Sequence, residues 1–205
     1  MNAPDPNAVR RGRRQLLLLA ALFFVPLAIA FWMYYGPTGW RPSGDASKGD
    51  LIDPARPLTA LALTTADGTQ TQPDFLRGKW SMVYVGDGLC DDRCRKALYL
   101  TRQSRIALNK DMDRVQRVFL VTGRCCDRGF LAQEHPDLVV ARVDDDASAA
   151  LLEPFPTYGG VPLADAGRIF IVDPLGNLLM SYAPTAPDKA LLTDMKKLLR
   201  LSHIG

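Results

Sequence analysis

Hydrophobic and polar positions follow several regular patterns along the chain. Residues 15–35 contain no charged side chain, which predicts a helix long enough to cross a bilayer. Two short, nearly continuous apolar runs at 80–86 and 115–123 are typical of strands buried on both faces, and 138–143 predicts a third strand. Between the first two runs, Cys94, Ala97 and Leu98 begin a series of apolar positions at three- and four-residue spacing, which predicts a helix.

The remaining patterns predict two hairpins and a closing helix. Residues 58–72 contain Asp67-Gly68 between two strand-like stretches, a typical hairpin turn, and 168–182 predicts two strands around a turn at 174–177. Residues 188–202 predict an amphipathic helix, with Leu191, Leu192, Met195, Leu198 and Leu199 on one face. A strand, a helix, a strand, a hairpin and a helix follow in the order of a thioredoxin-like domain, so the predicted fold class is α/β, thioredoxin-like, with a single N-terminal transmembrane helix.

The N-terminus predicts a membrane anchor. Arg10, Arg11, Arg13 and Arg14 precede the uncharged stretch, and such clusters stay on the cytoplasmic side. We therefore expect a cytoplasmic tail at 1–14, a transmembrane helix at 15–35, and export of everything that follows. A cleaved signal peptide is the alternative, because residues 28–30 fit a small-residue cleavage site, but the apolar run continues past them. In a bacterium, the anchor lies in the inner membrane and the domain lies in the periplasm.

Composition and charge support one exported domain. The 205 residues are 47% hydrophobic and 23% charged, with a net charge of +3, which suits one globular domain with an appendage. Residues 36–56 are rich in Gly, Pro, Ser and charge and predict a linker, followed by the domain at 57–205. The body of the chain has no basic block, so nucleic acid is not an expected partner.

Cys90 and Cys94 are the first candidates for chemistry. They follow the predicted strand 80–86 and are four residues apart, the spacing that places two side chains on one face of a helix. A disulfide between them requires Cys90 to lie at the looser start of the helix. The pair is read as a redox dithiol or as two ligands for a soft metal ion, with a static disulfide or two buried, inert cysteines as the alternatives. An exposed, charged loop in an oxidising compartment favours the first two readings.

Cys125 and Cys126 follow the predicted strand 115–123. A trans peptide holds adjacent Cα atoms near 3.8 Å, below the usual range for disulfides, which argues against a relaxed bridge between them. If the two strands are neighbours, all four thiols lie on one rim. One hypothesis is that Cys125 or Cys126 exchanges disulfides with the first pair or shares its metal; the alternative is that they are bystanders. His135 is expected on the surface, and neither it nor His203 is a strong ligand candidate.

The segments "DFLRGKWSMVYVGDGLCDDRC", "RVQRVFLVTG" and "IFIVDPLGNLLMSY" resemble the Sco (SenC) family. The resemblance implies a thioredoxin fold on the outer face of the membrane. It also implies a role in assembling the CuA centre of cytochrome c oxidase, by copper delivery or by reduction of that centre's cysteines. Cys90 and Cys94 match the two copper-binding cysteines of the family. The family's copper-binding histidine falls on Asp165, and the prolines after the motif cysteines are replaced by Asp91 and Arg95.

These departures favour thiol chemistry over copper delivery, because a carboxylate is a poor partner for a soft copper ion. The sequence therefore predicts a thiol–disulfide oxidoreductase that supports oxidase assembly through Cys90 and Cys94. Its expected partners are the inner membrane and a cytochrome c oxidase subunit or its assembly factors. The alternatives are a copper chaperone that uses Cys90 and Cys94, with Cys125, Cys126 or His135 as further ligands, and a non-catalytic assembly factor.

Overall fold

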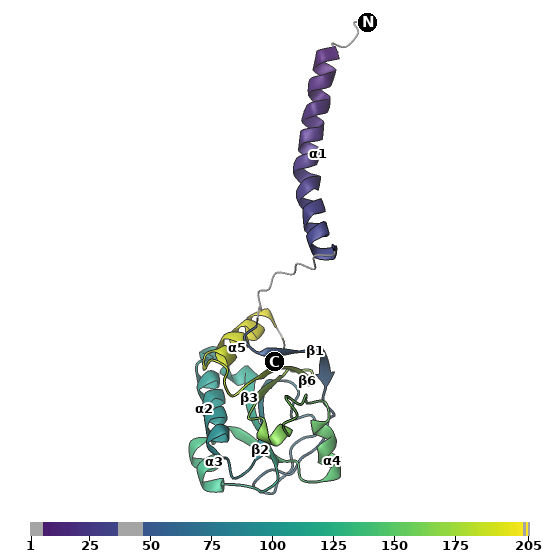
Figure 1. Cartoon of the computed structure of the whole chain (residues 1–205). Helices are drawn as coiled ribbons and strands as arrows, with labels where there is room; N and C mark the ends of the chain where they lie inside the picture. Colours follow the sequence, from purple (N-terminus) through teal and green to yellow (C-terminus); the bar gives the residue numbers. More distant parts are fainter. Residues whose placement is uncertain (1–5, 37–46, 203, 205) are drawn as a thin grey trace. The chain divides into compact units, whose positions relative to one another are not determined.

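The structure is a computed structural model that describes residues 6–36, 47–202 and 204, and it divides into two compact units. The first unit contains helix α1 (Pro6–Tyr35), which includes Pro26 (Figure 1). Its segment Arg10–Tyr35, of 26 residues, is long and apolar enough to span a membrane. The helix starts before the uncharged stretch, because arginine is itself a good helix former.

The second unit is built on one six-stranded sheet. The strand order is β1-β6-β5-β2-β3-β4, in which β2 pairs with β3 and β3 with β4 in parallel, while the other neighbours are antiparallel. The strands are β1 (Asp50–Pro57), β2 (Trp80–Asp87), β3 (Val115–Thr122), β4 (Leu138–Arg142), β5 (Ile169–Val172) and β6 (Asn177–Tyr182).

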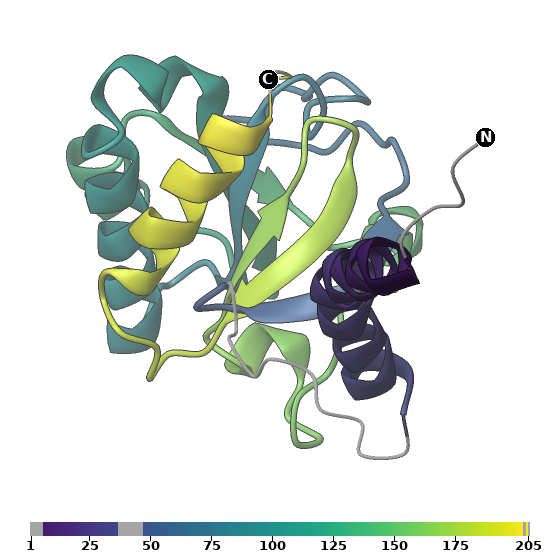
Figure 2. The ribbon, with the colours of Figure 1, turned by 90° about the horizontal axis from the view of Figure 1, so that it is seen from above.

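Helices cover both faces of the sheet. Helices α2 (Asp92–Ile106), α3 (Arg128–Glu134) and α5 (Ala190–Leu201) lie on one face, and the short α4 (Asp146–Ala149) lies on the other (Figures 1 and 2). Strand β2 serves both layers, because alternate side chains point to opposite faces. Tyr84 belongs to the core under α2 and α5, whereas Val83 and Val85 belong to the core on the α4 side. The continuous apolar run at 80–86 therefore reflects two cores.

The predicted strands and helices of the domain correspond closely to observed ones. The turn at Asp67-Gly68 is a tight hairpin bridged by Thr64 and Gln70, and the closing helix buries Leu191, Met195 and Leu199. The segment beside this turn also lies against the outer edge of the sheet, where the Ala66 amide donates to the Val140 carbonyl of β4.

Part of the predicted linker is a strand of the sheet. Residues 50–56 were expected to belong to the linker, but they form β1 at the sheet edge and pair with β6. Two prolines, Pro54 and Pro57, hid this strand, and prolines are tolerated in strands mainly at sheet edges. The buried carboxylate of Asp194 on α5 holds the residues just before β1, because it accepts hydrogen bonds from the amides of Lys48 and Gly49 at 2.7 and 2.9 Å. The rest of the predicted linker includes 37–46, outside the described residues.

A charged network is buried between α2, β3 and the end of α3. The guanidinium of Arg117 is fully buried and donates to Asp137 at 2.8 Å and to the Leu98 carbonyl at 2.8 Å. It also bonds to His135 Nδ1 at 3.1 Å. Burial lowers the pKa of Arg117 to about 10. A buried guanidinium must satisfy its donors, and in doing so Arg117 ties α2 and the end of α3 to strand β3 of the sheet.

Candidate redox site

Cys90 and Cys94 form a disulfide at the carboxyl end of β2. Cys90 precedes α2 and has φ 54°, in the left-handed region that non-glycine residues seldom adopt. Its amide donates to the carbonyl of Asp87 at 3.1 Å, which closes the turn after the strand. Cys94 lies in the first turn of α2, and the two Cα atoms are 5.0 Å apart. Cys90 thus lies at the loose start of the helix, where a bridge to Cys94 is allowed.

Both cysteines are more buried than their charged surroundings indicated. Each is 2% exposed and packs in the core with Tyr84 and Ala97, so the expectation of an exposed pair is wrong. The charged side chains of this segment point outward, while the helix start rests on the sheet. Both cysteines also line a surface pocket of about 350 Å³.

Asp91 caps α2 and places a carboxylate beside Cys94. Its Oδ1 accepts the Cys94 amide at 3.0 Å, and its other oxygen accepts Arg93 at 2.9 Å. These contacts, the Cys94 amide first, hold the pKa of Asp91 below its ordinary value. The negative charge is therefore retained at the cap, where it stabilises the helix start.

Arg95 places a positive charge beside Cys90. Its Nε donates to the Cys90 carbonyl at 3.2 Å, and its Nη2 pairs with Asp127 at 3.2 Å. The guanidinium lies 4.1 Å from the ring centre of Phe130. The contacts therefore place a cation at the Cys90 backbone and an anion at the Cys94 backbone, and a thiolate is favoured next to a cation and disfavoured next to an anion.

Tyr84 and Asp165 complete the wall of the cysteine pocket. Burial, with the Asp91 charge as a smaller cause, raises the pKa of Tyr84 to about 12, so its hydroxyl stays neutral. The Asp165 carbonyl accepts Arg93 at 2.9 Å, which holds the short 3₁₀ turn Leu163–Asp165 against α2. Asp165, the residue at the position of the Sco family's histidine, thus lies beside the Cys90–Cys94 disulfide. Tyr84, Arg93 and Arg124 were not predicted as pocket residues, although the alternation of β2 places Tyr84 on the α2 face.

Cys125 and Cys126 form a second disulfide. The peptide between them is cis and their Cα atoms are 3.1 Å apart. The prediction is against a relaxed bridge, and the two residues are bridged at a Cα separation below the usual range for relaxed disulfides. The expected common rim is confirmed, because β2 and β3 are parallel neighbours whose ends, Asp87 and Thr122, are in register. All four cysteines of the chain therefore lie in two disulfides at one edge of the sheet.

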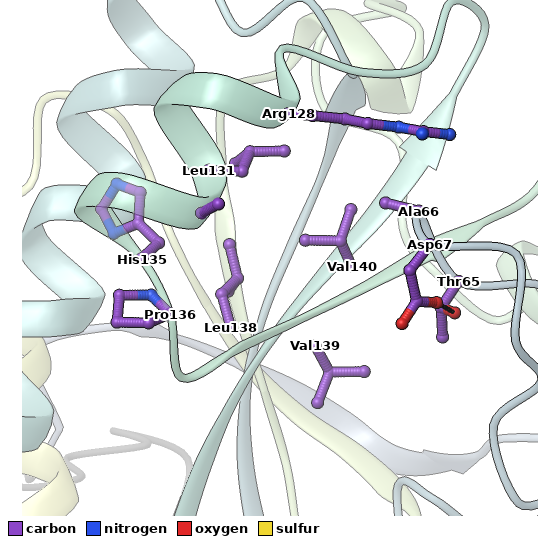
Figure 3. A pocket seen from close by; sticks show the side chains of 11 residues that line it. Thr65, Ala66, Asp67, Arg128, Leu131, His135, Pro136, Leu138, Val139 and Val140 are labelled. Atoms are coloured by element: carbon purple, nitrogen blue, oxygen red, sulfur yellow. Dashed lines mark hydrogen bonds between the residues drawn. The ribbon is translucent and has the colours of Figure 1, made fainter.

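His135 lies away from the cysteines and is buried, with 4% exposure, so its expected surface position is wrong. Arginine can only donate, so the contact from Arg117 makes His135 Nδ1 an acceptor and leaves the ring proton on Nε2. Burial, then the Arg117 charge, lowers the pKa of His135 to about 4. The ring lies at one end of a separate, mostly apolar cavity of about 540 Å³, with Thr65–Asp67 at the other end (Figure 3).

The donor set at the cysteine pocket suits thiol chemistry better than a three-ligand copper site. Cys90 and Cys94 are soft donors, but Asp91 and Asp165 are hard ones, and soft copper prefers sulfur and imidazole. Within residues 6–36 and 47–202, no three His, Cys, Asp or Glu side chains are grouped as metal ligands would be. His203 lies outside the described residues.

Comparison with known proteins identifies the class of the chain. Residues 80–202 match the family described as transmembrane-like, thioredoxin-like, C-terminal domain, and residues 6–37 match its transmembrane-like N-terminal domain. The first match covers more than half of the chain, so the protein belongs to this transmembrane-like, thioredoxin-like family. No curated protein matches the sequence.

Solved Sco structures share the fold. Copper-bound ScoI of Bradyrhizobium japonicum is 21% identical, with a TM-score of 0.52 over 70% of this chain and 98% of that one. Apo Sco1 of Thermus thermophilus is 19% identical, with a TM-score of 0.60 over 76% and 99%. BsSco, described as a Sco-family cytochrome c oxidase assembly protein with a disulfide switch, is 13% identical, with a TM-score of 0.55 over 75% and 99%. The resemblance to the Sco proteins is thus confirmed as a likeness of fold.

Proposed function

We propose that this protein is a membrane-anchored, Sco-like thiol–disulfide oxidoreductase that supports assembly of the CuA site of cytochrome c oxidase. The observation that carries the proposal is the Cys90–Cys94 disulfide at the sheet rim, in a fold shared with Sco proteins. The spanning helix α1 and the match to a transmembrane-like N-terminal domain support the anchor. The arginine cluster before it supports a periplasmic domain in a bacterial inner membrane.

The proposed reaction starts from the reduced pair. The Cys90 thiolate attacks one sulfur of a partner's disulfide, and the other partner sulfur leaves as a thiolate and takes up a proton. Cys94 then loses its proton and attacks Cys90 Sγ, which releases the second partner thiol and forms the Cys90–Cys94 disulfide. Cys90 is the attacking thiolate because Arg95 lies at its carbonyl, whereas the Asp91 carboxylate lies at the Cys94 amide.

The test is complementation in a strain that lacks this gene. The readout is the amount of assembled cytochrome c oxidase that contains CuA, at matched levels of the membrane-bound protein. We expect wild type to restore the oxidase and Cys90→Ser/Cys94→Ser to fail. Lys110→Ser, a change in the 3₁₀ turn Asn109–Arg114, away from the pocket, is the matched surface control. Full restoration by the double serine variant would refute thiol chemistry and leave a non-catalytic assembly role.

Copper delivery is the second candidate, supported by copper-bound Sco structures of the same fold. Copper would be a substrate held by Cys90 and Cys94 alone, because the pocket has no third soft donor among the described residues. The test is competition for Cu(I) with a chromogenic chelator, using the full chain in detergent micelles. One copper per chain, lost in Cys90→Ser/Cys94→Ser, would support this function; no transfer from the chelator would contradict it.

A further inference from the structure

The loop that carries Cys125 and Cys126 is joined through backbone hydrogen bonds to the turn before Cys90. The Gly88 amide donates to the Arg124 carbonyl at 2.9 Å, and the Asp127 amide donates to the Gly88 carbonyl at 3.0 Å. The two cysteines are the residues between these contacts. A methyl group on Gly88 would stand 2.5 Å from the Arg124 oxygen and 3.0 Å from the Cys125 Cα. Glycine at 88 thus allows the two backbones to touch, two residues before Cys90.

Side chains join the two disulfides as well. Arg95 bonds to the Cys90 carbonyl with one nitrogen and to Asp127, next to Cys126, with another. Asp127 in turn caps α3 by accepting the Phe130 amide at 3.1 Å. Cys125 and Cys126 pack against the core cluster that contains Cys90 and Cys94. Cys90 is two residues from Gly88, so its Cα lies at most about 7 Å from that of the residue in contact with the Cys125–Cys126 loop.

The two disulfides differ in accessibility. Cys90 and Cys94 are each 2% exposed, whereas Cys125 and Cys126 are both partly exposed, between the exposed side chains of Arg124 and Arg128. Exchange requires a thiolate to reach a sulfur, so a dithiol in solution meets the second pair more readily than the first.

We propose that Cys125 and Cys126 are a relay that carries electrons from an external dithiol to Cys90 and Cys94. This inference rests on the proposed function and supplies the reductant that its turnover needs. An external dithiol first reduces the Cys125–Cys126 disulfide and becomes a disulfide itself. One of the freed thiolates then attacks a sulfur of the Cys90–Cys94 disulfide, whose other sulfur leaves and takes up a proton. The remaining relay thiol loses its proton, re-forms the Cys125–Cys126 disulfide and releases the second inner thiol. Two electrons and two protons pass from the external dithiol to Cys90 and Cys94.

The first test uses four double serine variants of the full chain, each of which keeps one cysteine from each pair. In detergent micelles and a glutathione buffer that oxidises both pairs of wild type, at least one variant should form an intramolecular disulfide. Loss of alkylation and a cross-linked peptide in mass spectrometry detect the bond. If all four variants keep both thiols reduced, the relay is refuted.

The second test measures how fast limiting dithiothreitol reduces the Cys90–Cys94 disulfide, by differential alkylation at timed points. Cys125→Ser/Cys126→Ser should slow this reduction at least about tenfold, which equals ~1.4 kcal/mol; an unchanged or faster rate overturns the relay. The same variant, reduced beforehand, should still consume one equivalent of oxidised glutathione through Cys90 and Cys94. Failure of that single turnover would count against the proposed function itself, which separates the two hypotheses.

Discussion

Substitution of the buried Arg117 by methionine tests how the layer of α2 and α3 is held together. Methionine keeps most of the apolar stem but removes one of the donors to Asp137 and the donor to His135 Nδ1. Loss of one partner of a buried ion pair costs about 3–5 kcal/mol. Asp137 is 35% exposed and keeps a second contact, with Arg105 at 3.3 Å, so we expect Arg117→Met to lower the free energy of unfolding by about 2–3 kcal/mol.

The same substitution should change the protonation of His135. Burial and the Arg117 charge both lower its pKa, so removal of the charge should raise it, although not to the ordinary value. The assays are denaturant unfolding of the full chain in micelles, followed by near-UV circular dichroism, and NMR titration of the imidazole. Arg102→Met is the control for the unfolding measurement only, because its ion pair with Glu134 is partly exposed and should cost less than about 1 kcal/mol, while its charge also lowers the pKa of His135. An unchanged His135 pKa, or a loss below about 0.5 kcal/mol, would refute this account.

Three further predictions follow from the described contacts. The folded-state pKa of His135, about 4, lies below its unfolded value. The contribution of this residue to stability is therefore full above about pH 6.5 and is lost as the pH falls toward 4. The free energy of unfolding, measured against pH, should fall over this range in wild type but not in His135→Gln. Asp165→His adds an imidazole to the pocket of Cys90 and Cys94 and should raise the affinity for Cu(I) at least about tenfold in chelator competition. Asp165→Asn is the control and should leave the Cu(I) affinity unchanged. Asp194→Asn weakens the buried acceptor of the Lys48 and Gly49 amides and should lower the free energy of unfolding by about 1–3 kcal/mol; native-state hydrogen exchange should then accelerate at those two amides.

Periodicity predicted those elements whose burial follows a simple rule. Strands β2 and β3 are largely buried on both faces, and α5 carries one apolar stripe, so each was visible in the sequence. Strand β1 was not, because a single buried residue, Ile52, stands among prolines and charged residues. Sequence spacing alone could not show that this segment pairs with β6.

The candidate site was predictable in position but not in environment. The ends of β2 and β3 placed the four cysteines on one rim, and the resemblance to the Sco family pointed to Asp165. The burial of Cys90 depends on how α2 rests on the sheet, which local charge does not reveal. The buried position of His135 depends on Arg117, a residue type that is seldom fully buried, so a surface position was the natural expectation.

Both outer strands of the sheet are partly blocked. The Val140 carbonyl of β4 accepts the amide of Ala66, and β1 contains Pro54 and Pro57, which lack amide hydrogens. Such edges discourage unwanted sheet-to-sheet association between molecules. Addition of a strand from another molecule is therefore disfavoured at both sides of this sheet.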